Sequence, residues 1–219
     1  MLYIVSTPIG NLKDITLRAL ETLKKVDYIA AEDTRHVQKL LKAYEIKTPT
    51  ISYHSYSGRS KLDKLAEILQ EGKTVALVSD AGTPGISDPA YALIQKAIEL
   101  EVKVVPIPGA SALLAGLVAS GLPMDKFLYL GFLPLKKGRQ TLLKNLQSEK
   151  RTMVIFESPH RLLKTLNDLK ENFKESTKIA ICREVTKMYE EIFRGSLTQA
   201  IEHFTNKKPK GEFTLVVKN

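Results

Sequence analysis

The chain has 219 residues, of which 43% are hydrophobic and 26% charged, and its formal net charge is +9. This composition is typical of a soluble globular protein and excludes disordered and collagen-like chains. The lone cysteine, Cys182, excludes an intramolecular disulfide and favours a reducing, cytoplasmic compartment, and no basic segment precedes the first apolar run to suggest a signal peptide.

Strand-like and helix-like segments alternate through the first half of the chain. Short apolar runs predict five strands, at residues 2–6, 28–31, 50–53, 74–78 and 103–107. Leucines at helical spacing predict helices between them, at residues 16–25, 37–44, 62–72 and 91–100. This alternation is typical of a parallel sheet covered by helices on both faces. Ligands bind such sheets at the carboxyl ends of their strands.

Residues 104–124 carry no charge and are long enough to cross a bilayer. However, Pro106, Pro108 and Pro123 interrupt this stretch, and proline breaks a helix of that length. We therefore expect a buried strand, a turn and a buried helix here, and no membrane association.

The regular alternation of predicted strands and helices ends after residue 121. Strands are predicted at residues 127–131, 153–156, 178–182, 192–194 and 213–217, with helices at 138–146, 161–170 and 197–204. Two strands between residues 178 and 196 follow one another without a helix, which indicates an antiparallel pair. The sequence thus predicts two α/β domains: residues 1–121 with a parallel sheet, and residues 122–219 with a mixed sheet.

The positive charge is unevenly distributed along the chain. Residues 1–135 hold 15 basic and 14 acidic side chains, whereas residues 136–219 hold 18 and 10, a net charge of +8. A polyanion such as RNA is one expected partner of the second domain. The alternative is a solvated lysine-rich surface that keeps the protein soluble.

Three loops rich in glycine, proline and serine follow predicted strands of the first domain, at residues 6–12, 79–89 and 106–112. The second loop, with eleven residues, is longer than the usual connection of about 2–6 residues. Loops of this kind bind a ligand mainly through backbone groups. The sequence has no phosphate-binding P-loop, dinucleotide fingerprint, nucleophile elbow or histidine–cysteine metal cluster, so we expect neither a metal nor a covalent serine intermediate.

Long ordered motifs in this sequence resemble the tetrapyrrole-methylase (class III) superfamily, and within it the members that methylate ribosomal RNA. The resemblance spans residues 2–217. It rests on the segments TPIGNL at 7–12, AEDTR at 31–35, SDAGTPGISDP at 79–89, PGASA at 108–112, GFLP at 131–134, FESPHR at 156–161, REVTK at 183–187 and GEFTLVV at 211–217.

The resemblance implies an enzyme that uses S-adenosylmethionine to methylate a ribose 2′-hydroxyl, on a cytidine in the decoding region of 16S ribosomal RNA. It further implies a homodimer and a cofactor held in the cleft between two domains. It carries the cofactor-binding role over to Pro8, Asp80, Ala81, Gly82, Ser111, Ala112, Phe132 and Gly211. For Asp80 the alternative is bracing of the loop, and for Ser111 it is capping of the next helix.

Residues for RNA binding and catalysis can also be suggested. The side chains expected to contact RNA phosphates are Arg35, Arg161, Lys136, Lys137 and Arg139. An ion-pair role is the alternative for Arg35 and Arg161. Removing the proton of a ribose hydroxyl needs a base or a stabilising cation, and Lys187, Glu184 and Asp33 are the candidates. The sequence does not choose among them, and Asp33 is equally suited to capping a helix.

Two other functions remain open on sequence grounds. The same fold could methylate a tetrapyrrole or a protein side chain, although the net charge of +8 on residues 136–219 argues against a corrinoid substrate. A non-catalytic RNA-binding module would leave the loop at residues 79–89 without a role.

Overall fold

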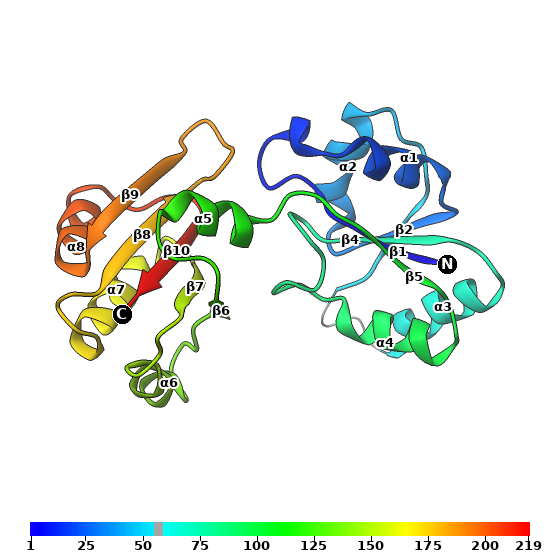
Figure 1. The fold of residues 1–219 in the computed structure, drawn as a ribbon. Helices are drawn as coiled ribbons and strands as arrows, with labels where there is room; N and C mark the ends of the chain where they lie inside the picture. The colour runs from blue at the N-terminus through cyan, green and yellow to red at the C-terminus, as the bar shows by residue number, and fades with distance from the viewer. Residues whose placement is uncertain (55–58) are drawn as a thin grey trace. The chain divides into compact units, whose positions relative to one another are not determined.

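A computed structural model describes residues 1–54 and 59–219 of the chain. It contains two compact units, Met1–Ser111 and Ala112–Asn219, which are coloured blue to green and green to red in Figure 1. The division falls before the helix α5 (Ala112–Ser120), not after residue 121 as the sequence predicted.

The first unit is built on a five-stranded sheet in the order β3-β2-β4-β1-β5. All neighbouring strands are parallel, as predicted. The strands are β1 (Leu2–Val5), β2 (Tyr28–Ala31), β3 (Thr50–Ser52), β4 (Val75–Val78) and β5 (Val104–Ile107). The connecting helices are η1 (Leu12–Asp14), α1 (Leu17–Lys25), α2 (Thr34–Ala43), α3 (Arg59–Gln70) and α4 (Tyr91–Glu99).

Alternating strand side chains of this sheet enter two separate cores. On β1, Val5 packs in a cluster with α1 and α2, whereas its neighbour Ile4 packs in a cluster with α3 and α4. Successive side chains of a strand point to opposite faces, so a sheet with two buried faces needs an apolar residue at nearly every position. This requirement explains the continuous apolar runs that predicted the strands.

The second unit contains a five-stranded sheet in the order β6-β7-β10-β8-β9. β6 and β7 are parallel, while β10 runs antiparallel to β7 and β8, and β8 runs antiparallel to β9. Both the mixed sheet and the antiparallel pair were predicted. The elements are β6 (Phe127–Phe132), α6 (Arg139–Leu146), β7 (Thr152–Glu157), α7 (Leu162–Asn172), β8 (Lys178–Arg183), β9 (Glu191–Ser196), α8 (Leu197–Asn206) and β10 (Phe213–Lys218).

Helix α5 joins the second unit because it covers one face of that unit's sheet. Leu113 and Leu117 pack with Val154 and Val216, and a Cβ added to Gly116 would lie 2.6 Å from the Thr214 methyl group. The charge-free stretch is thus divided into strand β5 and helix α5, as expected. None of the helices within residues 1–54 and 59–219 combines the length and the apolar character that crossing a bilayer requires.

Candidate functional site

The three loops at residues 6–12, 79–89 and 106–112 meet at one edge of the first sheet. Strand β1 lies between β4 and β5, so the chain segments that leave these three strands are neighbours. Backbone hydrogen bonds join Thr7 N–H to Gly82 O at 2.9 Å and Gly82 N–H to Thr7 O at 3.0 Å. The Ser6 and Thr83 hydroxyls lie 2.9 Å apart, and Thr83 Oγ1 donates to Ala110 O at 3.3 Å. These bonds fix all three loops as one assembly.

The close approach of these loops depends on two glycines. Gly82 has φ +80°, and a Cβ there would lie 3.3 Å from Ile9 Cγ2. A Cβ added to Gly109 would lie 3.0 Å from Ser6 Cβ. A side chain at either position would force the loops apart. Glycine at both positions therefore lets the loops lie close together and leaves their backbone amides and carbonyls accessible to a ligand.

Carboxylates gather beside this loop assembly. Asp80 is exposed, and its Oδ1 accepts a hydrogen bond from Asp33 N–H at 3.1 Å. The pKa of the Asp88 carboxyl is raised to about 6, mainly by burial and secondly by the nearby charge of Glu32. A hydrogen bond from Ser79 acts in the opposite direction and lowers this pKa, but its effect is smaller. Burial and the Asp80 charge likewise raise the pKa of Glu32. An edge with this concentration of negative charge favours a cationic ligand.

Asp88 is a candidate functional residue that the sequence analysis did not select. It lies within the motif at residues 79–89, but its position beside Glu32 depends on the pairing of β2 with β4. The only signal in the sequence was that Glu32 and Asp88 both follow strands that end at the same edge of the sheet.

Asp33 and Arg35 are engaged with each other. Asp33 Oδ1 accepts from the Arg35 backbone N–H at 2.8 Å and so caps α2. The Arg35 guanidinium also donates to both Asp33 oxygens, at 3.1 and 2.7 Å. These hydrogen bonds hold the pKa of the Asp33 carboxyl far below its usual range. Asp33 is therefore a poor proton acceptor, whereas Arg35, with its side chain 89% exposed, is accessible to an anion.

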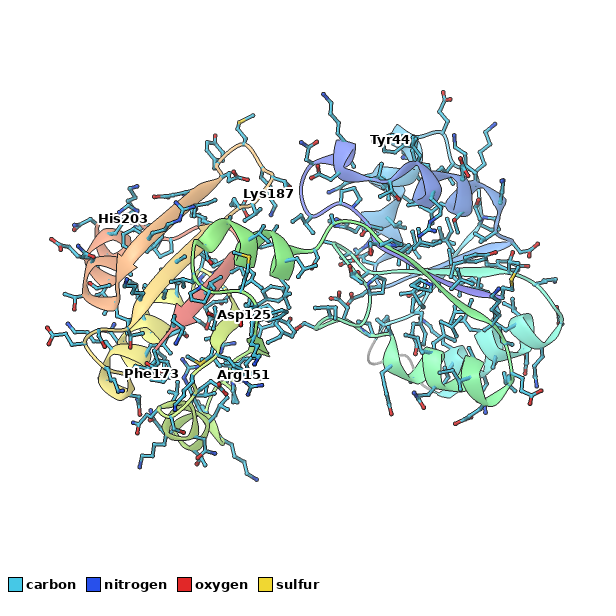
Figure 2. All side chains as sticks on the ribbon, viewed as in Figure 1. Tyr44, Asp125, Arg151, Phe173, Lys187 and His203 are labelled. Carbon is cyan, nitrogen blue, oxygen red and sulfur yellow. The ribbon has the colours of Figure 1, made fainter. Side chains whose placement is uncertain are left out.

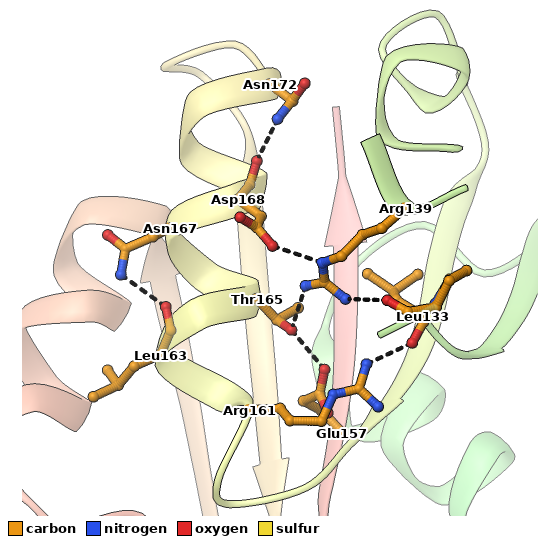
Figure 3. Close-up of polar contacts among 10 residues, drawn as sticks. Leu133, Arg139, Glu157, Arg161, Leu163, Thr165, Asn167, Asp168 and Asn172 are labelled. Carbon is orange, nitrogen blue, oxygen red and sulfur yellow. Dashed lines mark hydrogen bonds and ion pairs between the residues drawn. The ribbon is translucent and has the colours of Figure 1, made fainter. Parts of the chain in front are cut away.

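The second unit contains a buried polar network around Arg139 (Figure 3). Arg139 Nε donates to Asp168 Oδ2 at 2.7 Å, and its two terminal nitrogens donate to Pro134 O at 3.0 Å and Thr165 Oγ1 at 2.8 Å. Thr165 Oγ1 in turn donates to Glu157 Oε2 at 2.6 Å. Arg139 is only 4% exposed. The prediction that Arg139 contacts RNA is therefore wrong, because its guanidinium is buried and each of its three nitrogens donates to a partner within the protein.

Arg161 also belongs largely to this network. Its Nε lies 3.3 Å from Glu157 Oε1, and it donates to Leu133 O. Its side chain is 22% exposed, so the ion-pair role that the sequence left open is the one the structure shows.

Arg161 and Arg139 thus donate to two successive backbone carbonyls, those of Leu133 and Pro134, in the segment that follows β6. Phe132, the last residue of β6, is 52% exposed and packs its ring edge-on against Phe156 at 5.9 Å. Lys136 and Lys137, just beyond this segment, are exposed, so their predicted contact with RNA phosphates stays a prediction.

Lys187 lies on the loop that joins β8 and β9 (Figure 2). Its Nζ lies 2.8 Å from Glu184 Oε1 and 2.8 Å from Glu212 Oε2. Burial by itself would lower the pKa of the Lys187 ammonium, but these two hydrogen bonds outweigh it and raise the pKa. Burial by itself would raise the pKa of the Glu184 carboxyl. The hydrogen bonds from Lys187 and from the Glu212 backbone outweigh burial, so this pKa is lowered. Lys187 therefore stays protonated and Glu184 stays ionised, so neither is tuned to act as a base near neutral pH.

Gly211, to which the resemblance assigns a cofactor-binding role, lies against the side chain of Glu184. It adopts φ +91°, and a Cβ at this position would overlap the Glu184 side chain. The glycine therefore makes room for Glu184. Of the other predicted cofactor residues, Pro8, Asp80, Ala81, Gly82 and Ser111 belong to the first unit, and Ala112 and Phe132 belong to the second.

Comparison with known proteins agrees with this architecture. A family model described as tetrapyrrole (corrin/porphyrin) methylases matches residues 1–201. A protein from Synechocystis named ribosomal RNA small subunit methyltransferase I is 51% identical over 99% of this chain and 78% of its own length. A protein of the same name from Thermotoga maritima is 49% identical over 99% of this chain and 97% of its own length.

The solved structures show the same fold at lower sequence identity. The methyltransferase CobJ superposes with a TM-score of 0.73 at 20% identity, covering 100% of this chain and 93% of its own. The enzymes of this family take their methyl group from S-adenosylmethionine. With a family match over residues 1–201 and relatives about half identical along nearly the whole chain, this protein belongs to the tetrapyrrole (corrin/porphyrin) methylase family.

Proposed function

We propose that this protein methylates the RNA of the small ribosomal subunit, at the ribose 2′-hydroxyl of a cytidine in the decoding region of 16S ribosomal RNA. The observation that carries the proposal is the 51% and 49% identity, over 99% of the chain, to proteins named for small-subunit ribosomal RNA methylation. The net charge of +8 on residues 136–219 supports a polyanionic substrate and argues against a tetrapyrrole. The proposal includes the homodimer that the resemblance implies, which sedimentation velocity tests.

The loop assembly of the first unit fits S-adenosylmethionine. This cofactor carries two positive groups, a sulfonium and an ammonium, and the carboxylates of Glu32, Asp80 and Asp88 concentrate negative charge at the same edge. Asp80, Ala81 and Gly82 would contact the cofactor through backbone and carboxylate groups. When bound, S-adenosylmethionine supplies an electrophilic methyl group, so the task of the protein is to orient the ribose oxygen towards it.

None of the three candidate bases is suited to accept a proton near neutral pH. Asp33 and Glu184 are held ionised by ion pairs with Arg35 and Lys187, and Lys187 is held protonated. We therefore assign none of the three a role as a base. Arg35, Lys136 and Lys137 remain the accessible cations with which the protein would hold RNA phosphates.

Methylation of isolated small subunits with labelled S-adenosylmethionine tests the proposed function. The label is expected at the ribose of one cytidine of 16S RNA, and a subunit reconstituted with 2′-deoxycytidine at that position should take up no label there. Naked 16S RNA, tested in parallel, shows whether the assembled subunit is required. A label on the base of that nucleotide, or on ribosomal protein only, would contradict the assignment.

The raised pKa of Asp88 predicts a pH dependence of cofactor binding. Below pH about 6 the Asp88 carboxyl is protonated and the acidic edge loses a negative charge, so affinity for the cationic cofactor should fall. We expect binding several-fold weaker at pH 5 than at pH 7 by titration calorimetry. In the Asp88→Asn variant, which has no carboxyl to titrate at this position, the cofactor affinity should differ much less between pH 5 and pH 7. An unchanged pH profile in the variant would show that another group titrates.

A further inference from the structure

The loop at residues 184–190, between β8 and β9, exposes two large side chains at its tip. Met188 is 89% exposed and Tyr189 is 68% exposed. Side chains of this size gain free energy when they are covered, so two neighbouring ones on a single loop make it a candidate contact surface.

The backbone of this loop is held in an unusual conformation. Glu184 has φ +49° and Thr186 has φ +70°, although neither is a glycine. Thr186 N–H donates to Glu190 Oε2 at 2.6 Å, and Lys187 N–H donates to Glu184 O at 3.0 Å. Left-handed non-glycine residues persist where the surroundings over-determine them, and they are concentrated at functional sites.

The contacts of Lys187 explain how that conformation is maintained. Its ammonium joins Glu184, at the start of the loop, to Glu212, just before β10. Glu184 Oε1 also accepts from the Glu212 backbone N–H at 2.8 Å. The loop is thus fastened to the 207–212 segment, and Lys187 acts as a positioning residue for the tip.

Positive charge lies beside the same loop. Lys207, Lys208 and Lys210 are exposed on the segment to which the loop is fastened. Arg183 Nε donates to Lys210 O at 2.7 Å, which holds this segment beside the end of β8 where the loop begins. Of the carboxylates near the loop, Glu184 and Glu212 are paired with the Lys187 ammonium, and Glu191 is paired with Arg183 and Lys207. The Glu190 carboxylate accepts from the Thr186 N–H, so Lys208 and Lys210 supply the positive charge on offer to an anion.

We propose that this hairpin loop contacts single-stranded RNA, with Tyr189 stacking on an unpaired base, Met188 packing beside it, and Lys208 and Lys210 meeting the backbone phosphates. An exposed aromatic ring on a loop that is bonded to a lysine-bearing segment offers the stacking surface and the cations with which proteins hold single-stranded nucleic acid. The inference rests on the proposed function, since the RNA it names is the decoding-region segment of 16S RNA.

The test measures the affinity of the full chain for a fluorescent oligonucleotide of that segment, by anisotropy. Tyr189→Ala should weaken RNA binding by about tenfold, the order of effect expected from losing one stacked base. Tyr189→Phe keeps the ring and should bind RNA like the parent. Ile98→Ala is the matched control: Ile98 is 56% exposed at the end of α4, on the edge of the first sheet opposite the loop assembly, and its loss should change nothing. Cofactor affinity should be unchanged in all three variants.

A second pair of variants tests the positioning role of Lys187. Lys187→Met leaves two carboxylates unpaired and should weaken RNA binding at least as much as Tyr189→Ala, whereas Lys187→Arg can keep both ion pairs and should restore most of the affinity. Equal affinity in the parent, Tyr189→Ala and Lys187→Met would overturn the loop assignment while leaving the proposed function intact.

The outcomes separate the two proposals. A parent protein that neither binds the oligonucleotide nor methylates small subunits would overturn the proposed function, and the RNA contact with it. A Tyr189→Ala protein that keeps its RNA affinity but changes from dimer to monomer in sedimentation would show that a second copy of the chain covers the loop instead.

Discussion

Replacing Gly82 by valine is expected to weaken the binding of S-adenosylmethionine by at least about 100-fold, which corresponds to about 2.7 kcal/mol. Gly82 lies at φ +80°, where a β-branched residue is strained, and its N–H and carbonyl both bond to Thr7. A Cβ would also press on Ile9 Cγ2 at 3.3 Å. The loop that carries Asp80 and Ala81 would therefore move away from the other two.

Gly72→Val is the matched control for this prediction. Gly72 has nearly the same conformation, with φ +81°, but no atom lies within 4 Å of its Cβ position. It follows α3, at the opposite edge of the sheet from the loop assembly. Both variants place valine in the left-handed backbone region and so carry similar strain. They differ in that only Gly82→Val disturbs the loop assembly. Titration calorimetry, with circular dichroism to confirm folding, should show loss of binding in Gly82→Val alone; full affinity in a folded Gly82→Val protein would place the cofactor elsewhere.

Arg139→Met is expected to lower the free energy of unfolding of the second unit by about 3–5 kcal/mol. The change removes the cation that is paired with the Asp168 carboxylate, which is 13% exposed, while the Glu157 carboxylate keeps its ion pair with Arg161. It also leaves Pro134 O without its donor. An uncompensated buried charge costs more than the pair contributes, so the effect should be visible in urea unfolding followed by circular dichroism.

The neighbouring lysines provide the contrast. Reversing Lys136 and Lys137 to glutamate changes two exposed side chains, so stability should stay within about 0.5 kcal/mol. Affinity for RNA should fall, and the slope of log affinity against log salt should become shallower by about 1 for each phosphate that the variant no longer neutralises. If Arg139→Met left stability unchanged, or if the double reversal left RNA affinity unchanged, the division between a buried structural arginine and a basic surface would be wrong.

The periodicity and the loop motifs of the sequence predicted much of the architecture. Continuous apolar runs are required of strands buried on both faces, so the first sheet and its covering helices could be read from residue order. The convergence of the loops after β1, β4 and β5 also followed, because parallel strands present their carboxyl ends at one edge. The antiparallel pair of β8 and β9 was predicted because no helix separates them.

The boundary between the units was decided by packing instead. Helix α5 is apolar on most of its surface, so its sequence does not show which sheet it covers. Gly116 against Thr214, and Leu113 and Leu117 against Val216, place it on the second sheet.

The charged residues show most clearly what the sequence alone does not determine. Arg139 and Lys137 are two positions apart in one basic stretch, and nothing in the sequence distinguishes a cation for RNA from a cation for the protein interior. Only the tertiary structure brings Asp168, Thr165 and Glu157 to Arg139 and leaves Lys137 exposed. Likewise, the pKa of Asp88 is raised by burial and then by Glu32, and that of Lys187 is raised in part by Glu212; both carboxylates come from distant parts of the sequence. Local order in the sequence determines which elements form, whereas burial and electrostatic pairing depend on residues far apart in the chain, and so only the folded chain decides what each charged side chain does.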